Sequence, residues 1–175
     1  RKGQVRRPRA ESHRQGARIK DMVSIHERPA EALERVPGHW EGDLLKGKAN
    51  ASAIATLVER STRFTILVPI PPGWKSTTVA EALADAVHEL PEHMRTGLFK
   101  TLTWDRGTEM AAHAQFTVAT DVKVYFADPH SPWQRPGSEN INGLLRQYFP
   151  KGTDLSIHSA AELQRVADEL NDRPR

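Results

Sequence analysis

Three acidic residues stand where their type and spacing could do chemistry. Asp43 lies within a strand-like run, Asp105 follows a second, apolar run, and Glu139 opens a helical run after a Pro-rich loop. Carboxylates that converge repel one another, so they need a shared proton or a cation between them. Oxygen ligands suit Mg²⁺ or Mn²⁺, and two such ions about 3.5 to 4 Å apart promote in-line phosphoryl transfer. The three residues therefore suggest a two-ion site for phosphoryl transfer.

Each acidic residue also has a purely structural interpretation. Asp43 can be a charge on an edge strand, Asp105 can form an Asx turn before Gly107, and Glu139 can be a first-turn acid that favours the helix dipole. Alternation along the strand 39–45 puts Glu41 on the same face as Asp43. Glu41 is then either an additional metal ligand or, the preferred interpretation, the ion-pair partner of an arginine.

A second kind of metal site is weakly indicated. Glu109 and His113 stand four residues apart on an expected helix, and His130 is the third residue that they could recruit for zinc. No His-Glu-x-x-His motif is present, and the chain contains no cysteine. We therefore favour His113 as a surface residue or a residue that supports the main site.

The elements that must position these side chains follow from the hydrophobic periods. A short strand at 22–25 and a helical run after Pro29 precede three close strand-like runs; strands and helices then alternate, and a capping box of Ser159 and Glu162 opens the last helix. A hairpin start followed by βαβ crossovers implies an α/β fold: a mixed five-stranded sheet with helices on both faces, the order of the ribonuclease H-like fold. Strands are expected at 39–45, 53–59, 63–70, 98–104 and 122–127. Helices are expected from the N-cap Ser76 to Leu90, at 109–117, at 139–149 and from 160 onward.

Length and charge limit the class of protein. The 175 residues suit one domain, the absence of cysteine points to a reducing compartment, and no apolar run approaches the ~20 residues that span a bilayer. The first 20 residues hold eight Lys or Arg and one Glu, for +7, whereas the other 155 hold 17 Lys or Arg and 21 acidic residues, for −4. We expect a basic arm or linker at 1–36, suited to a phosphate backbone or simply solvated, and a core at 37–175 that is compact from Pro37 on.

Four sequence blocks resemble a known family. They are GHWEGD at 38–43, TWDRGTE at 103–109, PHSPWQR at 129–135 and ENINGLLRQY at 139–148, which continues into FPKGTD. In this order they are similar to the bacterial insertion-sequence-thirty transposases, from about Asp21 to the last residue. The resemblance implies a ribonuclease H-like integrase core with the chemistry of a DDE recombinase.

By that resemblance Asp43 and Asp105 match the two catalytic aspartates and Glu139 the catalytic glutamate. The 33 residues between Asp105 and Glu139 fit the family's spacing. All three are expected to bind Mg²⁺ or Mn²⁺, two ions in all. The implied reaction is nicking at the ends of the element, followed by attack of the freed 3′ hydroxyl on target DNA. Metal activates the oxygen, so no protein nucleophile is expected.

Several residues near these blocks are expected to contact DNA. Trp133 can stack on an unpaired base or pack beneath its own loop, and Arg106, where relatives commonly carry Asn, can contact a phosphate or pair with Glu109. Pro136 and Gly137 depart from the family's loop pattern. The residues expected to contact DNA are Arg106, Trp133, Arg135, Asn140, Arg146 and Lys151, with a solvated helix face as the alternative for Arg146 and Lys151.

The resemblance therefore implies the catalytic core of a transposase, expected to come from a longer chain, since the family also carries an N-terminal helix-turn-helix region that recognises the ends of the element. The expected partners are the element ends and target DNA, with a homo-oligomer at full length, no membrane, and the bacterial cytoplasm and nucleoid as the location. Two alternatives stay open. One is a DNA-binding remnant without activity, and the other is a plain nuclease on the same fold, which would cleave DNA without joining it.

Overall fold

A five-stranded sheet forms the centre of the molecule in this computed structural model, which describes residues 19–174. The strand order is β3-β2-β1-β4-β5. The first three strands are antiparallel neighbours, whereas β1, β4 and β5 run parallel. The predicted mixed five-stranded sheet is confirmed. Its strands are β1 (His39–Lys46), β2 (Ala53–Glu59), β3 (Thr65–Ile70), β4 (Thr101–Trp104) and β5 (Lys123–Phe126).

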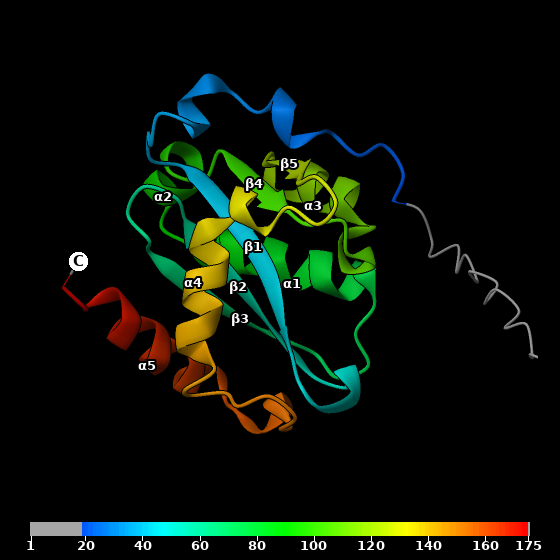
Figure 1. The fold of residues 1–175 in the computed structure, drawn as a ribbon, viewed down its shortest axis with the longest axis vertical. Coiled ribbons are helices and arrows are strands. Elements are labelled where there is room, and N and C mark those ends of the chain that lie inside the picture. The colour runs from blue at the N-terminus through cyan, green and yellow to red at the C-terminus, as the bar shows by residue number, and fades with distance from the viewer. Residues whose placement is uncertain (1–18, 175) are drawn as a thin grey trace, which may run out of the picture.

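Helices cover both faces of the sheet, as the alternation of strands and helices predicts. Helices α1 and α3 pack together on one face, and α4 and α5 lie on the other, where α4 crosses β1 and β2 (Figure 1). Each face has its own buried apolar cluster. The helices are α1 (Ser76–Glu89), α2 (Glu92–Gly97), α3 (His113–Thr120), α4 (Pro136–Leu145) and α5 (Ala160–Asn171).

Strand β1 divides its side chains between the two faces with period two. Trp40 and Leu44 enter the cluster beneath α1, and Leu45 enters the cluster beneath α4. Gly42 faces the ring of Trp104 so closely that a Cβ atom would lie 2.2 Å from the ring. The central strand therefore needs a residue without a side chain immediately before Asp43.

Two helix starts differ from those predicted. Helix α4 begins at Pro136, three residues before Glu139, because proline at the first helical position has a preset φ and lacks only a hydrogen bond that this position does not make. Helix α1 begins at Ser76 itself, with Lys75 as the N-cap. The short α2 after Pro91 is absent from the prediction because its six residues are too few to show a period.

The last helix begins as the sequence predicts. The Ser159 hydroxyl accepts a hydrogen bond from the Glu162 N–H at 3.1 Å. This contact satisfies one of the free N–H groups at the start of α5. Leu163, Val166 and Leu170 are buried on the apolar face of the helix.

The segment before β1 is packed against the core. Ile19 and Ile25 are buried, and Ser24 forms an isolated parallel bridge with Phe126 of β5. The predicted start of compact structure at Pro37 is therefore too late, and the predicted strand at 22–25 is reduced to a single bridge followed by short 3-10 helices. The run after Pro29 forms one of these.

The charged arm lies largely outside the described residues, since residues 1–18 are among those not described. Across residues 19–174, no helix is both long and apolar enough to cross a membrane.

Candidate functional site

Asp43 lies in β1, and Asp105 directly follows the neighbouring parallel strand β4. The register of the two strands ends with the pair of Glu41 and Thr103, and each aspartate comes two residues after its member of that pair. Asp43 is half-buried, and its Oδ1 accepts the N–H of Leu44 at 2.9 Å. The Oδ1 atom of Asp105 accepts a backbone N–H at 2.8 Å in the Asx turn that the sequence predicts.

Arg135 lies between the two aspartates. Its Nη1 donates to the Gly42 carbonyl at 2.9 Å and stands 4.0 Å from Asp43 Oδ2, and its Nη2 stands 3.6 Å from Asp105 Oδ2. Only 9% of the Arg135 side chain is exposed. This residue, predicted to contact DNA, is the cation that joins the two carboxylates.

The electrostatics of the pair disfavour two bare carboxylates. Burial raises the pKa of Asp43, and the negative charges of Asp105 and Glu109 raise it further, whereas Arg135 and the N–H of Leu44 oppose the rise. One guanidinium therefore only partly offsets burial and repulsion, and the site favours additional positive charge.

Glu139 lies in the first turn of α4 and is exposed. Three residues further along the same helix, Asn142 donates from Nδ2 to Asp43 Oδ2 at 2.8 Å. One helical turn thus separates the Glu139 position from a side chain in direct contact with Asp43. Within residues 19–174, no group of three or more His, Cys, Asp or Glu side chains is arranged to hold a metal ion. Asp43 and Asp105 are brought together around Arg135, and a direct contact of Glu139 with them stays a prediction.

Glu41 anchors the start of α4. It is buried, and its Oε1 accepts a hydrogen bond from Arg60 Nη1 at 2.8 Å. Its Oε2 accepts the backbone N–H of Ser138 at 2.9 Å. A Cβ atom on Gly137 would come 2.9 Å from that oxygen, so glycine suits this departure from the family's loop. The arginine partnership predicted for Glu41 is confirmed.

The residues of the alternative zinc hypothesis have other partners. Glu109 is buried and pairs with Lys46 Nζ at 3.5 Å, with Trp104 Nε1 also 3.5 Å away. The Nε2 atom of His113 contacts the Lys20 carbonyl at 2.8 Å. His113 is buried, so the surface position predicted for it is wrong.

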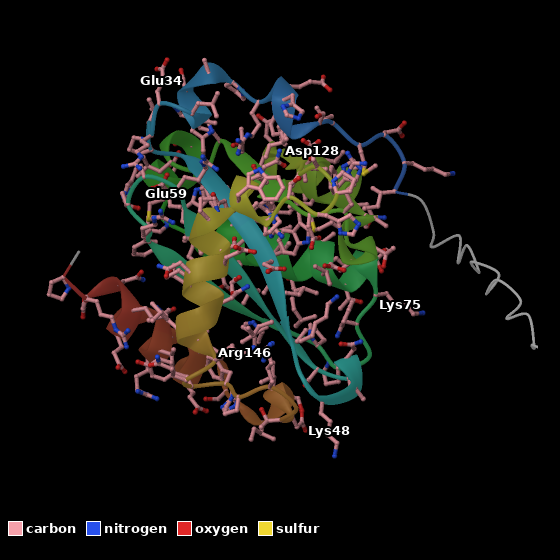
Figure 2. The ribbon with its side chains drawn as sticks, viewed as in Figure 1. Glu34, Lys48, Glu59, Lys75, Asp128 and Arg146 are labelled. Atoms are coloured by element: carbon pink, nitrogen blue, oxygen red, sulfur yellow. The ribbon has the colours of Figure 1, made fainter. Side chains whose placement is uncertain are left out.

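Near Asp105, a cleft of about 320 Å³ includes Arg106, Asp128 and His130 in its lining. Arg106 donates from Nε to the Ala127 carbonyl at 3.1 Å and lies 3.9 Å from Asp128, so the pairing of Arg106 with Glu109 is not the one observed. Figure 2 labels Asp128 near the end of the sheet where α4 begins.

The remaining predicted DNA contacts divide into exposed and tethered side chains. Trp133 is 70% exposed, which rules out packing beneath its own loop in this structure, and Asn140 and Lys151 are exposed too. Arg146 is half-buried toward the far end of α4 (Figure 2) and donates to the carbonyls of Lys46 and Phe149. Its guanidinium is thus already bound to the fold.

The sequence indicated no role for Asn142, and it predicted that Arg135 contacts DNA rather than the two aspartates. The signal for Asn142 was its i+3 spacing from Glu139, which places both on neighbouring turns of one helix face. No pattern pointed to Arg135, because an arginine in a Pro-rich loop carries no period that gives its direction.

Comparison with known proteins gives a consistent family. The integrase core domain family matches residues 34–132. The chain is 54% identical over 97% of its length to the transposase for insertion sequence element IS1086 of Cupriavidus metallidurans. It is 52% identical over 90% of its length to the transposase InsI for insertion sequence element IS30A of Escherichia coli. It spans 49% and 40% of the length of these two relatives.

Solved structures agree on the fold. The catalytic core domain of BIV integrase superposes with a TM-score of 0.55 at 16% identity, covering 80% of this chain and 87% of that one. A simian T-cell lymphotropic virus intasome in complex with PP2A regulatory subunit B56 gamma gives a TM-score of 0.55 at 17% identity, covering 80% of this chain and 56% of that one. These likenesses support the ribonuclease H-like fold.

Proposed function

The chain belongs to the integrase core domain family, among the IS30-type transposases, and from that premise we propose that it cleaves and joins DNA strands by metal-dependent phosphoryl transfer. One observation carries the proposal: Asp43 of β1 and Asp105, directly after the neighbouring parallel strand β4, share one guanidinium, that of Arg135. Helix α4, which carries Glu139, contacts Asp43 through Asn142.

The residues present fit a divalent cation. Arg135 shows that a positive charge is accommodated between the aspartates, and the repulsion that raises the pKa of Asp43 is relieved by more positive charge. The donors of Asp43, Asp105 and Glu139 are all oxygens, which suit Mg²⁺ or Mn²⁺. We infer that these three carboxylates hold two such ions, which activate an attacking oxygen and neutralise charge on the phosphate when bound.

The chain's own residues supply position. Asn142 and the N–H of Leu44 each donate to one oxygen of Asp43 and fix its orientation. Glu41 fixes the first turn of α4 through the Ser138 N–H, which sets the height of Glu139 above the sheet. Catalysis of this type depends on holding reactants in line rather than on a protein nucleophile.

In the proposed reaction, water first attacks a phosphodiester at the element end, and the P–O bond to the leaving 3′ oxygen breaks. The freed 3′ hydroxyl then attacks a target phosphodiester, and one P–O bond forms as another breaks. We propose that Arg106, Asn140 and Lys151, all of them exposed, contact DNA. We propose the element ends and target DNA as partners, and a homo-oligomer for the full-length protein.

An oligonucleotide assay tests the proposal. Pre-cut DNA ends, labelled at the 5′ side, are incubated with the chain and Mg²⁺ or Mn²⁺, and joined products are resolved by length. The wild type should give joined products that Asp105→Asn and Glu139→Gln abolish. Equal product from all three proteins, or none from the wild type with either metal, contradicts the proposal. Cleavage without joining identifies a plain nuclease instead.

A further inference from the structure

A second cavity lies on the other side of the loop that carries Arg135. Its volume is about 380 Å³, and it lies between the segment before β1 and the loop leading into α4. Leu33 and Trp133 belong to its walls, together with Arg28 and Arg60. We propose that this cavity binds one unstacked nucleotide of the DNA substrate, with its base against Trp133 and its phosphate near the two arginines. The inference rests on the proposed function and adds a nucleotide site outside the carboxylates.

The apolar wall is exposed without a partner in the fold. Trp133 and Leu33 are both 70% exposed, although they come from segments 100 residues apart in the chain. Large apolar side chains that gather at one exposed cavity indicate a ligand surface. An indole face stacks on any nucleobase, and such stacking strengthens binding by about 5- to 150-fold for each base.

The polar side of the cavity carries an excess of positive charge. Burial and, to a smaller extent, the positive charge of Arg60 lower the pKa of Arg28 to about 10, against the opposing effect of Glu41. Arg60 pairs with Glu41, whereas Arg28 donates to the neutral hydroxyl of Thr103 at 3.2 Å. Glu41 is thus the carboxylate beside the two guanidiniums, while the Asp128 carboxylate at the rim is bound by His26 and Gln134, and a phosphate would supply a second negative charge next to the arginines.

The rim of the cavity is braced before any ligand binds. His26 and Gln134, both in the lining, hydrogen-bond to the same carboxylate of Asp128, at 2.7 and 2.9 Å. Gln134 also accepts the Asp128 N–H at 2.7 Å. A site held in place by such contacts loses less conformational entropy when it binds.

The position of the cavity ties it to the reaction site. Pro136, the first residue of α4, is part of the lining, and Arg135 immediately precedes it. A nucleotide in the cavity would therefore sit at the start of the helix that carries Glu139. A nucleotide that adjoins a phosphate held at the carboxylates would suit this position, and we therefore favour a nucleotide over a peptide as the occupant.

The test measures binding of an oligonucleotide by fluorescence. One probe is a duplex with an unpaired 2-aminopurine overhang, and the matched probe is the blunt duplex with 2-aminopurine paired inside. Trp133→Ala should weaken binding of the overhang probe about tenfold and remove the quenching of its fluorescence, with little change for the blunt duplex. Trp133→Phe should keep most of the affinity, and Arg28→Gln should weaken the overhang probe selectively.

Ile157→Ala is the control, because Ile157 is 73% exposed yet lies outside this cavity's lining. The nucleotide site is overturned if Trp133→Ala weakens binding of both probes equally or of neither. If binding of neither probe is weakened, the exposed surface around Trp133 fits a protein partner instead. The wild type separates the two proposals. Overhang binding that depends on Trp133, without any joining by the wild type, would leave this inference standing while the proposed chemistry fails, and joining without such binding would do the reverse.

Discussion

Replacing Arg135 by glutamine removes the cation between Asp43 and Asp105. Breaking a fully buried ion pair costs about 3 to 5 kcal/mol. Here the cost is smaller, because the N–O distances are 4.0 and 3.6 Å and the Asp105 side chain is 42% exposed. Adding the charged hydrogen bond from Arg135 to the Gly42 carbonyl, we expect the free energy of unfolding to fall by about 2 to 3 kcal/mol.

Urea unfolding of the metal-free protein measures this change, with Arg106→Gln as the matched control. Arg106 is 42% exposed and stands 3.9 Å from Asp128, so its loss should cost less than about 1 kcal/mol. Saturating Mg²⁺ should narrow the gap between Arg135→Gln and wild type, because the ion supplies the missing charge. The assigned role of Arg135 would be wrong if Arg135→Gln and Arg106→Gln lowered the free energy of unfolding equally, or if Mg²⁺ left the difference between Arg135→Gln and wild type unchanged.

Three further predictions test the packing and charge that support the site. Gly42→Ala should lower the free energy of unfolding by about 3 kcal/mol, because its Cβ would overlap the Trp104 ring. Gly143→Ala, in the open surface of α4, should instead raise the free energy of unfolding by about 0.5 to 1 kcal/mol. Thermal melts in which the two variants change stability in the same direction would contradict this. The raised pKa of Asp43 means that the folded state keeps this proton to higher pH than the unfolded state, so wild-type stability falls as pH rises through the raised value. Asp43→Asn has no carboxyl group to ionise in this buried position, so its stability relative to wild type should increase with pH from about 3.8 upward. Thermal melts that give the two proteins parallel profiles of stability against pH would contradict this prediction. Ser159→Ala should cost about 1 kcal/mol through loss of the α5 cap, read from the same melts, and no change would show the cap to be dispensable.

Much of the fold follows from local sequence patterns. Period-two alternation placed Glu41 and Asp43 on one face of the strand, and in the structure both side chains contact α4. The Ser159 cap of α5 and the Asx turn considered for Asp105 depend on residues close in the chain, and both hydrogen bonds are present. Features that a few consecutive residues determine were therefore predictable.

Contacts between distant segments were less predictable. Nothing local indicates that Arg135 reaches the carbonyl of Gly42, because the loop direction depends on where α4 docks on the sheet. The segment around Ile19 and Ile25 has too short a pattern to show that it packs beside β5. Helix α4 begins before Glu139 because a proline that usually signals a loop also suits the first helical turn.

We propose that Glu139 joins Asp43 and Asp105 in holding divalent metal. Titration of the protein with Mn²⁺, followed by the electron paramagnetic resonance of the free ion, tests this without DNA or activity. Glu139→Gln should weaken Mn²⁺ binding at least about tenfold, as Asp105→Asn should. Wild-type Mn²⁺ binding by Glu139→Gln, beside weakened binding by Asp105→Asn, would contradict it.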